Sequence, residues 1–183
     1  MKKIDLSKYN NDWYVVGAPG WKKLLWYFAN TMFFLNPLNP ISSLKVRILK
    51  LFGAKIGEGV IIKPRVNIKY PWKLAIGKNV WIGEGVWIDN LEEVRIGDNC
   101  CISQGAMLLT GNHNYKKESF DLILGKIALE DGVWIGAKSV VCPSVTCASH
   151  SILSVCSVAT KNLDSYTIYQ GNPAAPIRKR EME

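Results

Sequence analysis

One histidine, placed where a repeated sequence pattern stops, is the residue best suited to do chemistry in this chain. His113 lies in Thr110-Gly111-Asn112-His113-Asn114-Tyr115, which ends a run of six-residue repeats and opens an irregular segment of about residues 114–126. An imidazole can accept a proton near neutral pH and is the usual general base in enzymes. Because a regular scaffold interrupted at a histidine presents that side chain to a ligand, His113 is the candidate catalytic residue.

The remaining side chains with reactive groups are weaker candidates. His150, the second of two histidines, lies inside a repeat and is expected to be structural. The five cysteines are odd in number and lack Cys-x-x-Cys spacing, so we expect idle thiols rather than disulfides or a zinc cluster. A zinc-dependent carbonic anhydrase on a repeat scaffold would need three histidines, which this sequence lacks. No metal site is therefore expected.

The elements that must position His113 are the repeats themselves. Each unit starts with an aliphatic residue, has glycine or small polar residues at its centre, and carries a small or β-branched residue at its fifth position. Neither an amphipathic helix nor a half-buried strand explains a recurrence of six residues. The units begin at Ile56, Ile62, Ile76, Ile82, Ile96, Ile102, Leu129, Ile135 and Val141.

Three such units form one turn of a triangular coil. The first and fifth residues of each unit point inward, and successive turns stack at ~4.8 Å through backbone hydrogen bonds. The sequence therefore predicts an all-β fold, a parallel β-helix of roughly five turns. The ends of such a coil need caps, and the N-terminal segment and C-terminal tail are the candidates.

Two helices are predicted before the repeats. Residues 20–35 are apolar nearly all round, and the segment Asn36-Pro37-Leu38-Asn39-Pro40 ends this helix because proline lacks an amide hydrogen. A second helix is expected over residues 41–52, with Ser42 or Ser43 as its N-cap and Gly53 as its stop.

The first helix has three interpretations, and its charge does not separate them. It can pack on the coil, contact another subunit, or lie at a membrane surface with lysines at the lipid headgroups, but it is too short to span a bilayer. The net charge of +8 is concentrated before Gly53 and suits an anionic partner, whether lipid, nucleic acid or a phosphorylated ligand. The opening residues do not resemble a signal peptide, so we expect a cytoplasmic protein.

Several motifs are similar to those of a known family. Leu51-Phe52-Gly53-Ala54-Lys55-Ile56-Gly57, Tyr70-Pro71-Trp72-Lys73-Leu74, Thr110-Gly111-Asn112-His113 and Gly171-Asn172-Pro173-Ala174 resemble the hexapeptide-repeat acyltransferases, and among them the colanic acid biosynthesis acetyltransferase group. The resemblance extends from the N-terminal helices to about Arg178. It implies a left-handed coil, although parallel crossovers are generally right-handed. It also implies an N-terminal helical segment over 1–53, a β-helix over 54–170 and a C-terminal tail over 171–183.

The resemblance implies roles for individual residues. In related galactoside and maltose acetyltransferases the corresponding histidine is the general base, so His113 would activate an acceptor hydroxyl for direct attack on acetyl-CoA. In the family, acetyl-CoA lies in a groove between neighbouring subunits of a homotrimer. The positions that match its cofactor-binding motifs are Trp134, Ala137, Thr160, Lys161 and Arg178. A lysine and an arginine suit the phosphates of CoA.

Fewer motifs indicate which residues bind the acceptor. Asp89 and Asn90 lie where relatives place polar groups that bind the acceptor, although the surrounding residues depart from the galactoside enzymes. Asn114 and Tyr115 follow the histidine and are also candidate acceptor-binding residues, while Phe120 and Asp121 could roof the pocket. The sequence does not name the acceptor sugar or the hydroxyl that is acetylated.

The expected function is O-acetylation of a sugar during exopolysaccharide, capsule or O-antigen assembly. The acceptor is a free or lipid-linked saccharide, and nucleic acid is not an expected partner. A polysaccharide pathway would give the basic N-terminal segment a reason to contact the membrane. Two alternatives stay open: N-acetylation of an amino sugar or a xenobiotic by the same base, and a repeat scaffold without catalysis that binds a partner or lipid.

Overall fold

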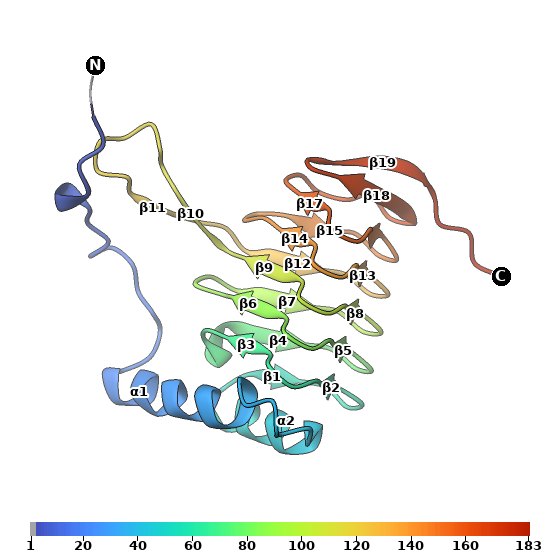
Figure 1. The fold of residues 1–183 in the computed structure, drawn as a ribbon, viewed down its shortest axis with the longest axis horizontal. Coiled ribbons are helices and arrows are strands. Elements are labelled where there is room, and N and C mark those ends of the chain that lie inside the picture. Colours follow the sequence, from blue (N-terminus) through green and yellow to red (C-terminus); the bar gives the residue numbers. More distant parts are fainter. Residues whose placement is uncertain (1–2) are drawn as a thin grey trace.

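A triangular coil of short parallel strands rests on two N-terminal helices in the computed structural model, which describes residues 3–183 (Figure 1). Met1 and Lys2, the start of the predicted segment 1–53, lie outside the described residues. The helices are α1 (Gly20–Ala29), continued by the π-helical turn η2 (Asn30–Phe34), and α2 (Ser42–Leu51). Short 3₁₀ turns lie at Leu6–Lys8 and Pro71–Lys73.

The coil has three faces, and each face is one parallel sheet. The first sheet contains β1 (Lys55–Ile56), β4 (Leu74–Ile76), β7 (Val94–Ile96), β12 (Ile127–Leu129) and β15 (Thr146–Cys147). The second contains β2 (Ile61–Ile62), β5 (Trp81–Ile82), β8 (Cys101–Ile102), β13 (Trp134–Ile135), β16 (Ile152–Leu153) and β18 (Thr167–Gly171), with β19 (Ala174–Lys179) antiparallel at its edge. The third contains β3 (Asn67–Ile68), β6 (Trp87–Asp89), β9 (Met107–Leu109), β14 (Val140–Val141) and β17 (Val158–Ala159).

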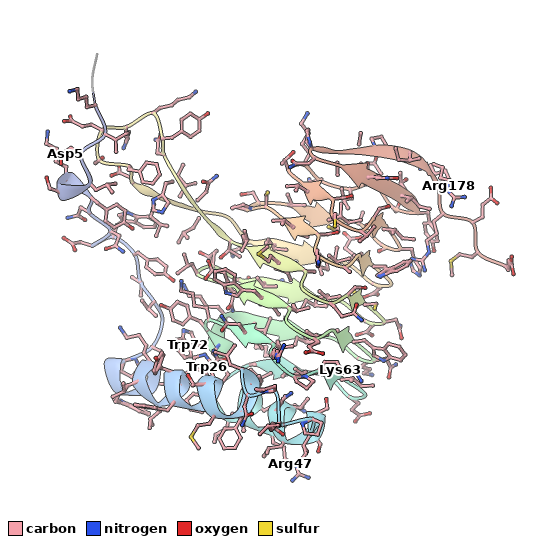
Figure 2. All side chains as sticks on the ribbon, in the orientation of Figure 1. Asp5, Trp26, Arg47, Lys63, Trp72 and Arg178 are labelled. Atoms are coloured by element: carbon pink, nitrogen blue, oxygen red, sulfur yellow. The ribbon has the colours of Figure 1, made fainter. Side chains whose placement is uncertain are left out.

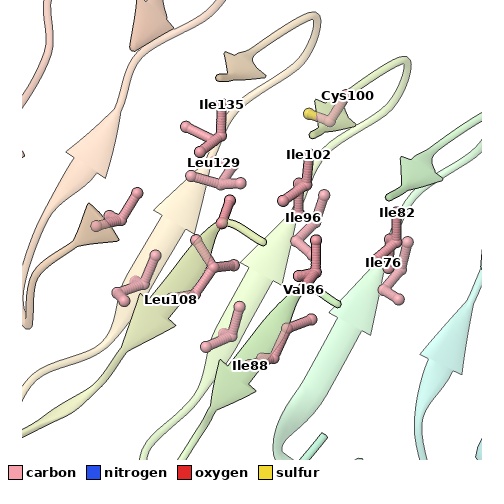
Figure 3. Packing of buried hydrophobic residues seen from close by; sticks show 14 of the residues in the cluster. Ile76, Ile82, Val86, Ile88, Ile96, Cys100, Ile102, Leu108, Leu129 and Ile135 are labelled. Carbon is pink, nitrogen blue, oxygen red and sulfur yellow. The ribbon is translucent and has the colours of Figure 1, made fainter. Parts of the chain in front are cut away.

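The core is the aliphatic column that the repeat pattern predicts. Ile62, Ile82, Ile102 and Ile135 stack along the second sheet with no exposed surface, and the fifth residues of the units are buried beside them (Figure 3). Six parallel strands in the second sheet give the coil about six turns, one more than the repeat count predicts. The predicted parallel β-helix is confirmed.

The fourth residue of each repeat turns the corner. All nine units have a positive φ there, at glycine in four units and at Asn79, Asn99 and other non-glycine residues in the rest. The second position explains another group of glycines: a Cβ on Gly77 would lie 2.7 Å from the backbone of Gly97 in the next turn. Close stacking of the turns therefore requires a missing side chain at this position.

The helices close the lower end of the coil, as expected. Trp26, Phe34 and Leu49 are buried against it, and Gly53 with φ of 99° follows the end of α2. The predicted serine N-cap is wrong, because the N-cap residue is Ile41. The Ser42 hydroxyl instead accepts a hydrogen bond from the Ile62 amide at 2.6 Å, so it joins helix to coil.

The interruption after His113 is more ordered than a loop. Strands β10 (Gly111–His113) and β11 (Leu122–Leu124) pair in antiparallel register and form a hairpin that projects from the coil (Figure 1). It leaves after β9 on the third sheet and returns to β12 on the first. The C-terminal tail is also structured, since β19 pairs with β18 over Ala174–Lys179.

Candidate active site

The side chain of His113 is held by the far arm of its own hairpin. Its Nδ1 lies 2.9 Å from the carbonyl oxygen of Phe120, and the two rings stack at 4.5 Å with 7° between their planes. A carbonyl oxygen only accepts hydrogen bonds, so Nδ1 is the donor and Nε2 keeps its lone pair. The arrangement fixes the tautomer of the imidazole without a carboxylate.

An N-terminal arm, residues 5–18, runs beside the hairpin and was not foreseen from the sequence. The Tyr9 ring lies 5.9 Å from that of His113. The Asp5 amide donates to the Glu118 carbonyl at 2.9 Å, and Lys8 forms a 2.7 Å ion pair with the Glu118 carboxylate. Lys8 and Glu118 lie 110 residues apart in sequence, and only tertiary packing brings them together.

The other hairpin residues stabilise the turn. The Asn114 amide donates to the Asp121 carbonyl at 2.8 Å, and its side-chain oxygen accepts from the Lys116 amide. Hydrogen bonds from Ser119, and then Lys117, lower the pKa of the Asp121 carboxyl. Tyr115 is 72% exposed, so its ring is accessible to a ligand.

Asp89 and Asn90, two adjacent residues predicted to bind the acceptor, have different environments. Asn90 is fully buried, donates to the Tyr70 carbonyl at 2.7 Å and accepts from the Tyr70 amide at 3.0 Å. Its amide is therefore used to hold the coil, and a structural role accounts for it. Asp89 is partly exposed, with its carboxylate 3.0 Å from the Lys69 ammonium group.

Asp89 faces a hollow of about 360 Å³ between α1 and the third sheet. Its walls include the rings of Tyr70 and Trp87 and the ammonium group of Lys69. Asn30 also lines the hollow, and its side-chain oxygen is buried without a hydrogen-bond donor. Aromatic walls beside a partly exposed carboxylate suit a molecule with several hydroxyl groups.

The predicted cofactor residues are divided between two sides of the coil. Trp134 points outward from the second sheet, is 46% exposed, and donates from Nε1 to the Ser103 hydroxyl at 2.9 Å. A hollow of about 440 Å³ lies on the same face beside Trp81 and Ser103. Strand register then continues from Trp134 through Ile152 and Ile168 to the exposed Arg178 on β19.

Three further predicted residues lie at the edges of the coil. Ala137 is half-buried in the turn after β13, between the second and third sheets. Thr160 and Lys161 are exposed after β17, on the edge between the third and first sheets from which the His113 hairpin leaves two turns lower. Arg180, which the sequence reasoning missed, donates to the carbonyls of Gly132 and His150 and fastens the tail.

His113 and Trp134 cannot meet within one chain. In a triangular coil, the edge between the first and third faces lies opposite the second face. Figure 1 shows the β10–β11 hairpin on one side and the column β2–β5–β8–β13 on the other, and Figure 2 places Arg178 on the latter side. One chain therefore carries two halves of the predicted site, directed away from each other.

The second histidine and two of the cysteines pack against neighbouring residues. The His150 ring stacks on Tyr166 at 4.7 Å at a corner of the coil's last turns, consistent with a structural role. Cys100 and Cys147 are buried, and burial raises the pKa of the Cys147 thiol to about 12, which disfavours a thiolate nucleophile. In residues 3–183, no three acidic, cysteine or histidine side chains gather as a metal site would require.

Sequence comparison finds a relative that matches most of the chain. A putative colanic acid biosynthesis acetyltransferase, WcaF, from Escherichia coli (strain K12) is 34% identical over 164 residues, which cover 90% of this chain and 90% of the relative. No protein-family model matches the chain.

Two solved structures share the fold. Galactoside acetyltransferase in complex with coenzyme A matches with a TM-score of 0.79 at 24% identity, covering 91% of this chain and 86% of that one. A hexapeptide-repeat acetyltransferase from Vibrio cholerae, complexed with acetyl coenzyme A, matches with a TM-score of 0.73 at 21% identity, covering 80% and 81%. The expected left-handed parallel β-helix is confirmed.

Proposed function

Because the chain belongs to the hexapeptide-repeat acetyltransferases, we propose that it moves an acetyl group from acetyl-CoA to a sugar hydroxyl during polysaccharide assembly. The observation that carries the proposal is the imidazole of His113, whose Nδ1 is committed to the Phe120 carbonyl at 2.9 Å. Its Nε2 is left to accept a proton. The similarity to the colanic acid enzyme supports a polysaccharide as the acceptor.

The reaction needs one proton acceptor and no protein nucleophile. The acceptor hydroxyl gives its proton to Nε2 of His113 as its oxygen attacks the carbonyl carbon of the thioester. The tetrahedral intermediate then expels the CoA sulfur, which takes the proton from the imidazolium. The Phe120 carbonyl stabilises the charged ring, because it accepts from the Nδ1 hydrogen throughout.

The division of the site between two sides of the coil supports a trimer with active sites at the subunit interfaces. Coils packed side by side would bring the hairpin edge of one subunit against the second face of the next. His113 and Lys161 from one chain would then meet Trp134 from its neighbour. The exposed aromatic rings of Trp81 and Trp134 on that face are suited to burial between subunits.

Acetyl-CoA would lie along the outward row of the second face. Trp134 would contact the pantetheine arm, the Ala137 backbone would follow, and Arg178 would bind phosphate three strands further along, or about 14 Å away. Thr160 and Lys161 of the adjoining subunit would close the groove. Arg178 and Lys161 are both exposed, which leaves their charges available for phosphate.

The acceptor would enter from the third face. Asp89 lies one turn below Leu109, after which the hairpin begins, so its hollow lies below the start of the hairpin. We assign Asp89 to the acceptor hydroxyls, with Asn114 and Tyr115 above them. Asn90 is left out because both groups of its amide are already bound to Tyr70.

Substitution of the histidine tests the catalytic role. His113→Ala should lower kcat by about 10²–10⁴-fold, while calorimetry shows unchanged acetyl-CoA binding. His150→Ala is the matched control and should retain turnover if the protein stays folded. Loss of CoA binding in His113→Ala would show that its role is misassigned.

Acceptor chemistry is tested separately with labelled acetyl-CoA and a panel of sugars, lipid-linked saccharides and amino sugars. Transfer to hydroxyls supports the proposal, and transfer only to amines would replace it with N-acetylation. A wild-type protein that does not bind acetyl-CoA would favour the non-catalytic scaffold. Because acetyl-CoA is present in the cytoplasm, we propose that the enzyme acts on the cytoplasmic side of the membrane.

A further inference from the structure

The lower surface of the molecule exposes a large apolar area that the proposed reaction does not use. This basal face is formed by the outward side chains of α1, η2, α2 and the segment between them. Trp21 and Met32 are more than 60% exposed, and Leu38 is 86% exposed. The apolar residues of the basal face are Trp21, Leu24, Leu25, Phe28, Met32, Leu35, Leu38, Ile41 and Leu51.

Helical geometry places the exposed apolar residues of α1 and η2 along one side of the helix. Trp26 points from α1 into the protein, where its Nε1 donates to the Ile68 carbonyl at 2.9 Å. Leu24 and Phe28 lie four residues apart on the opposite side of the helix, in line with Trp21 and Met32. A helix that only caps a coil normally presents polar residues to water on that side. The outward stripe therefore requires a second apolar environment.

The charge of this region indicates what that environment is. Between Asp12 and Glu58 the sequence has six lysines and arginines and no acidic residue. One of them, Lys45, is buried, with its ammonium group donating to the Lys63 carbonyl at 2.9 Å. The others reach the surface, and Figure 2 shows Arg47 directed away from the coil.

A second copy of the same face is a poor partner, because each cation would meet another cation. An anionic lipid surface supplies both an apolar layer and phosphate groups. None of the helices described over residues 3–183 has the length and hydropathy to cross a bilayer. A helix of this composition lies in the plane of the headgroups instead.

We propose that the basal face docks on an anionic phospholipid membrane, with Trp21, Leu24, Phe28 and Met32 inserted at the boundary between headgroups and acyl chains. Lys23, Arg47 and Lys50 would contact lipid phosphates. Docking deepens the proposed function, and rests on it for the acceptor, because it orients the His113 site above a membrane from which long lipid-linked saccharides could reach it. In the proposed trimer, three basal faces point the same way and bind together.

Sedimentation with vesicles of phosphatidylglycerol and phosphatidylcholine tests the docking. The wild-type protein should sediment with these vesicles, and far less with pure phosphatidylcholine. Leu24→Glu/Phe28→Glu should reduce the bound fraction at least 10-fold. Arg47→Gln/Lys50→Gln should weaken affinity roughly 30-fold, from about fivefold for each cation.

A matched control carries the same two charge changes at the other end of the coil. Val155→Glu/Met182→Glu replaces exposed apolar residues away from the basal face and should bind vesicles like the wild-type protein. Circular dichroism and light scattering check that all variants keep their fold and oligomeric state. If Leu24→Glu/Phe28→Glu alters the oligomeric state and leaves vesicle binding intact, the basal face is a subunit contact and the proposal is wrong.

The outcome is separable from that of the proposed reaction. Absence of wild-type binding to anionic vesicles, alongside normal acetyl-CoA binding, overturns the docking alone. Absence of acetyl-CoA binding overturns the proposed function and leaves vesicle binding as an independent result. Equal binding of the basal-face variants and the wild-type protein also overturns the docking.

Discussion

The orientation of His113 depends on two aromatic contacts whose removal has a predictable size. Phe120 stacks on the imidazole at 4.5 Å, and Tyr9 lies 5.9 Å from it on the arm. Aromatic pairs of this kind contribute about 0.5–1.5 kcal/mol each beyond the area they bury. Phe120→Ala removes the stack and leaves the backbone carbonyl that accepts from Nδ1.

If loss of the stack raises the activation free energy by about 1 kcal/mol, kcat should fall about fivefold. Phe120→Ala should therefore lower kcat by this factor at saturating acetyl-CoA and leave the KM for acetyl-CoA unchanged. Tyr9→Ala/Phe120→Ala should reach about 30-fold if the two contacts act independently. Circular dichroism and thermal unfolding of the variants distinguish a loss of positioning from damage to the fold.

Lys116→Ala, an exposed change in the same hairpin turn, is the control and should stay within about twofold of the wild-type kcat. An unchanged kcat in Phe120→Ala would refute the idea that the stack holds the ring. A loss as large as that of His113→Ala would mean that the whole hairpin has rearranged.

Two predictions concern stability. Ile62 is fully buried and its neighbour Ile61 is 36% exposed, so Ile62→Ala should cost about 2–5 kcal/mol of unfolding free energy and Ile61→Ala clearly less, as measured by chemical denaturation. Equal costs would contradict the inward direction of Ile62. Burial lowers the pKa of Lys45 in the folded state, so the unfolded chain binds its proton more tightly. Stability should therefore rise with pH in the window just below 10.5, and Lys45→Met should lack this gain when urea midpoints are compared. A similar gain in Lys45→Met would assign it to other groups.

The fold could be predicted because a short sequence pattern specifies it and recurs along the chain. Nine units carry an aliphatic residue at the first position and a positive φ at the fourth. Each unit therefore packs against nearly the same kind of neighbour. The place of His113 followed from the break in this pattern. The break did not predict a hairpin, because Gly111–His113 and Leu122–Leu124 pair across a turn with no strong local motif.

The sequence was a poorer guide where tertiary contacts override local pattern. Asn90 resembles a ligand-binding residue in an irregular stretch, but its amide matches the Tyr70 backbone one turn below. Ser42 has the composition of an N-cap, yet its hydroxyl binds the Ile62 amide of the coil. The contact between Lys8 and Glu118 joins residues 110 positions apart, which no periodicity can indicate.

The height of the histidine above the basal face limits the acceptor. The basal helices lie across the end of the coil, so the coil axis would stand on the docked membrane (Figure 1). The hairpin leaves after β9, two turns above β3, which adds about 10 Å to a helix layer about 10 Å thick. His113 therefore lies roughly 20 Å or more from the headgroups.

A single sugar on a lipid phosphate would not reach His113, whereas a longer lipid-linked oligosaccharide would. With acceptors in vesicles, acetylation should increase steeply as the saccharide is lengthened, and should lose this dependence when the same saccharides are released from lipid. Efficient acetylation of a membrane-bound lipid monosaccharide would contradict this geometry.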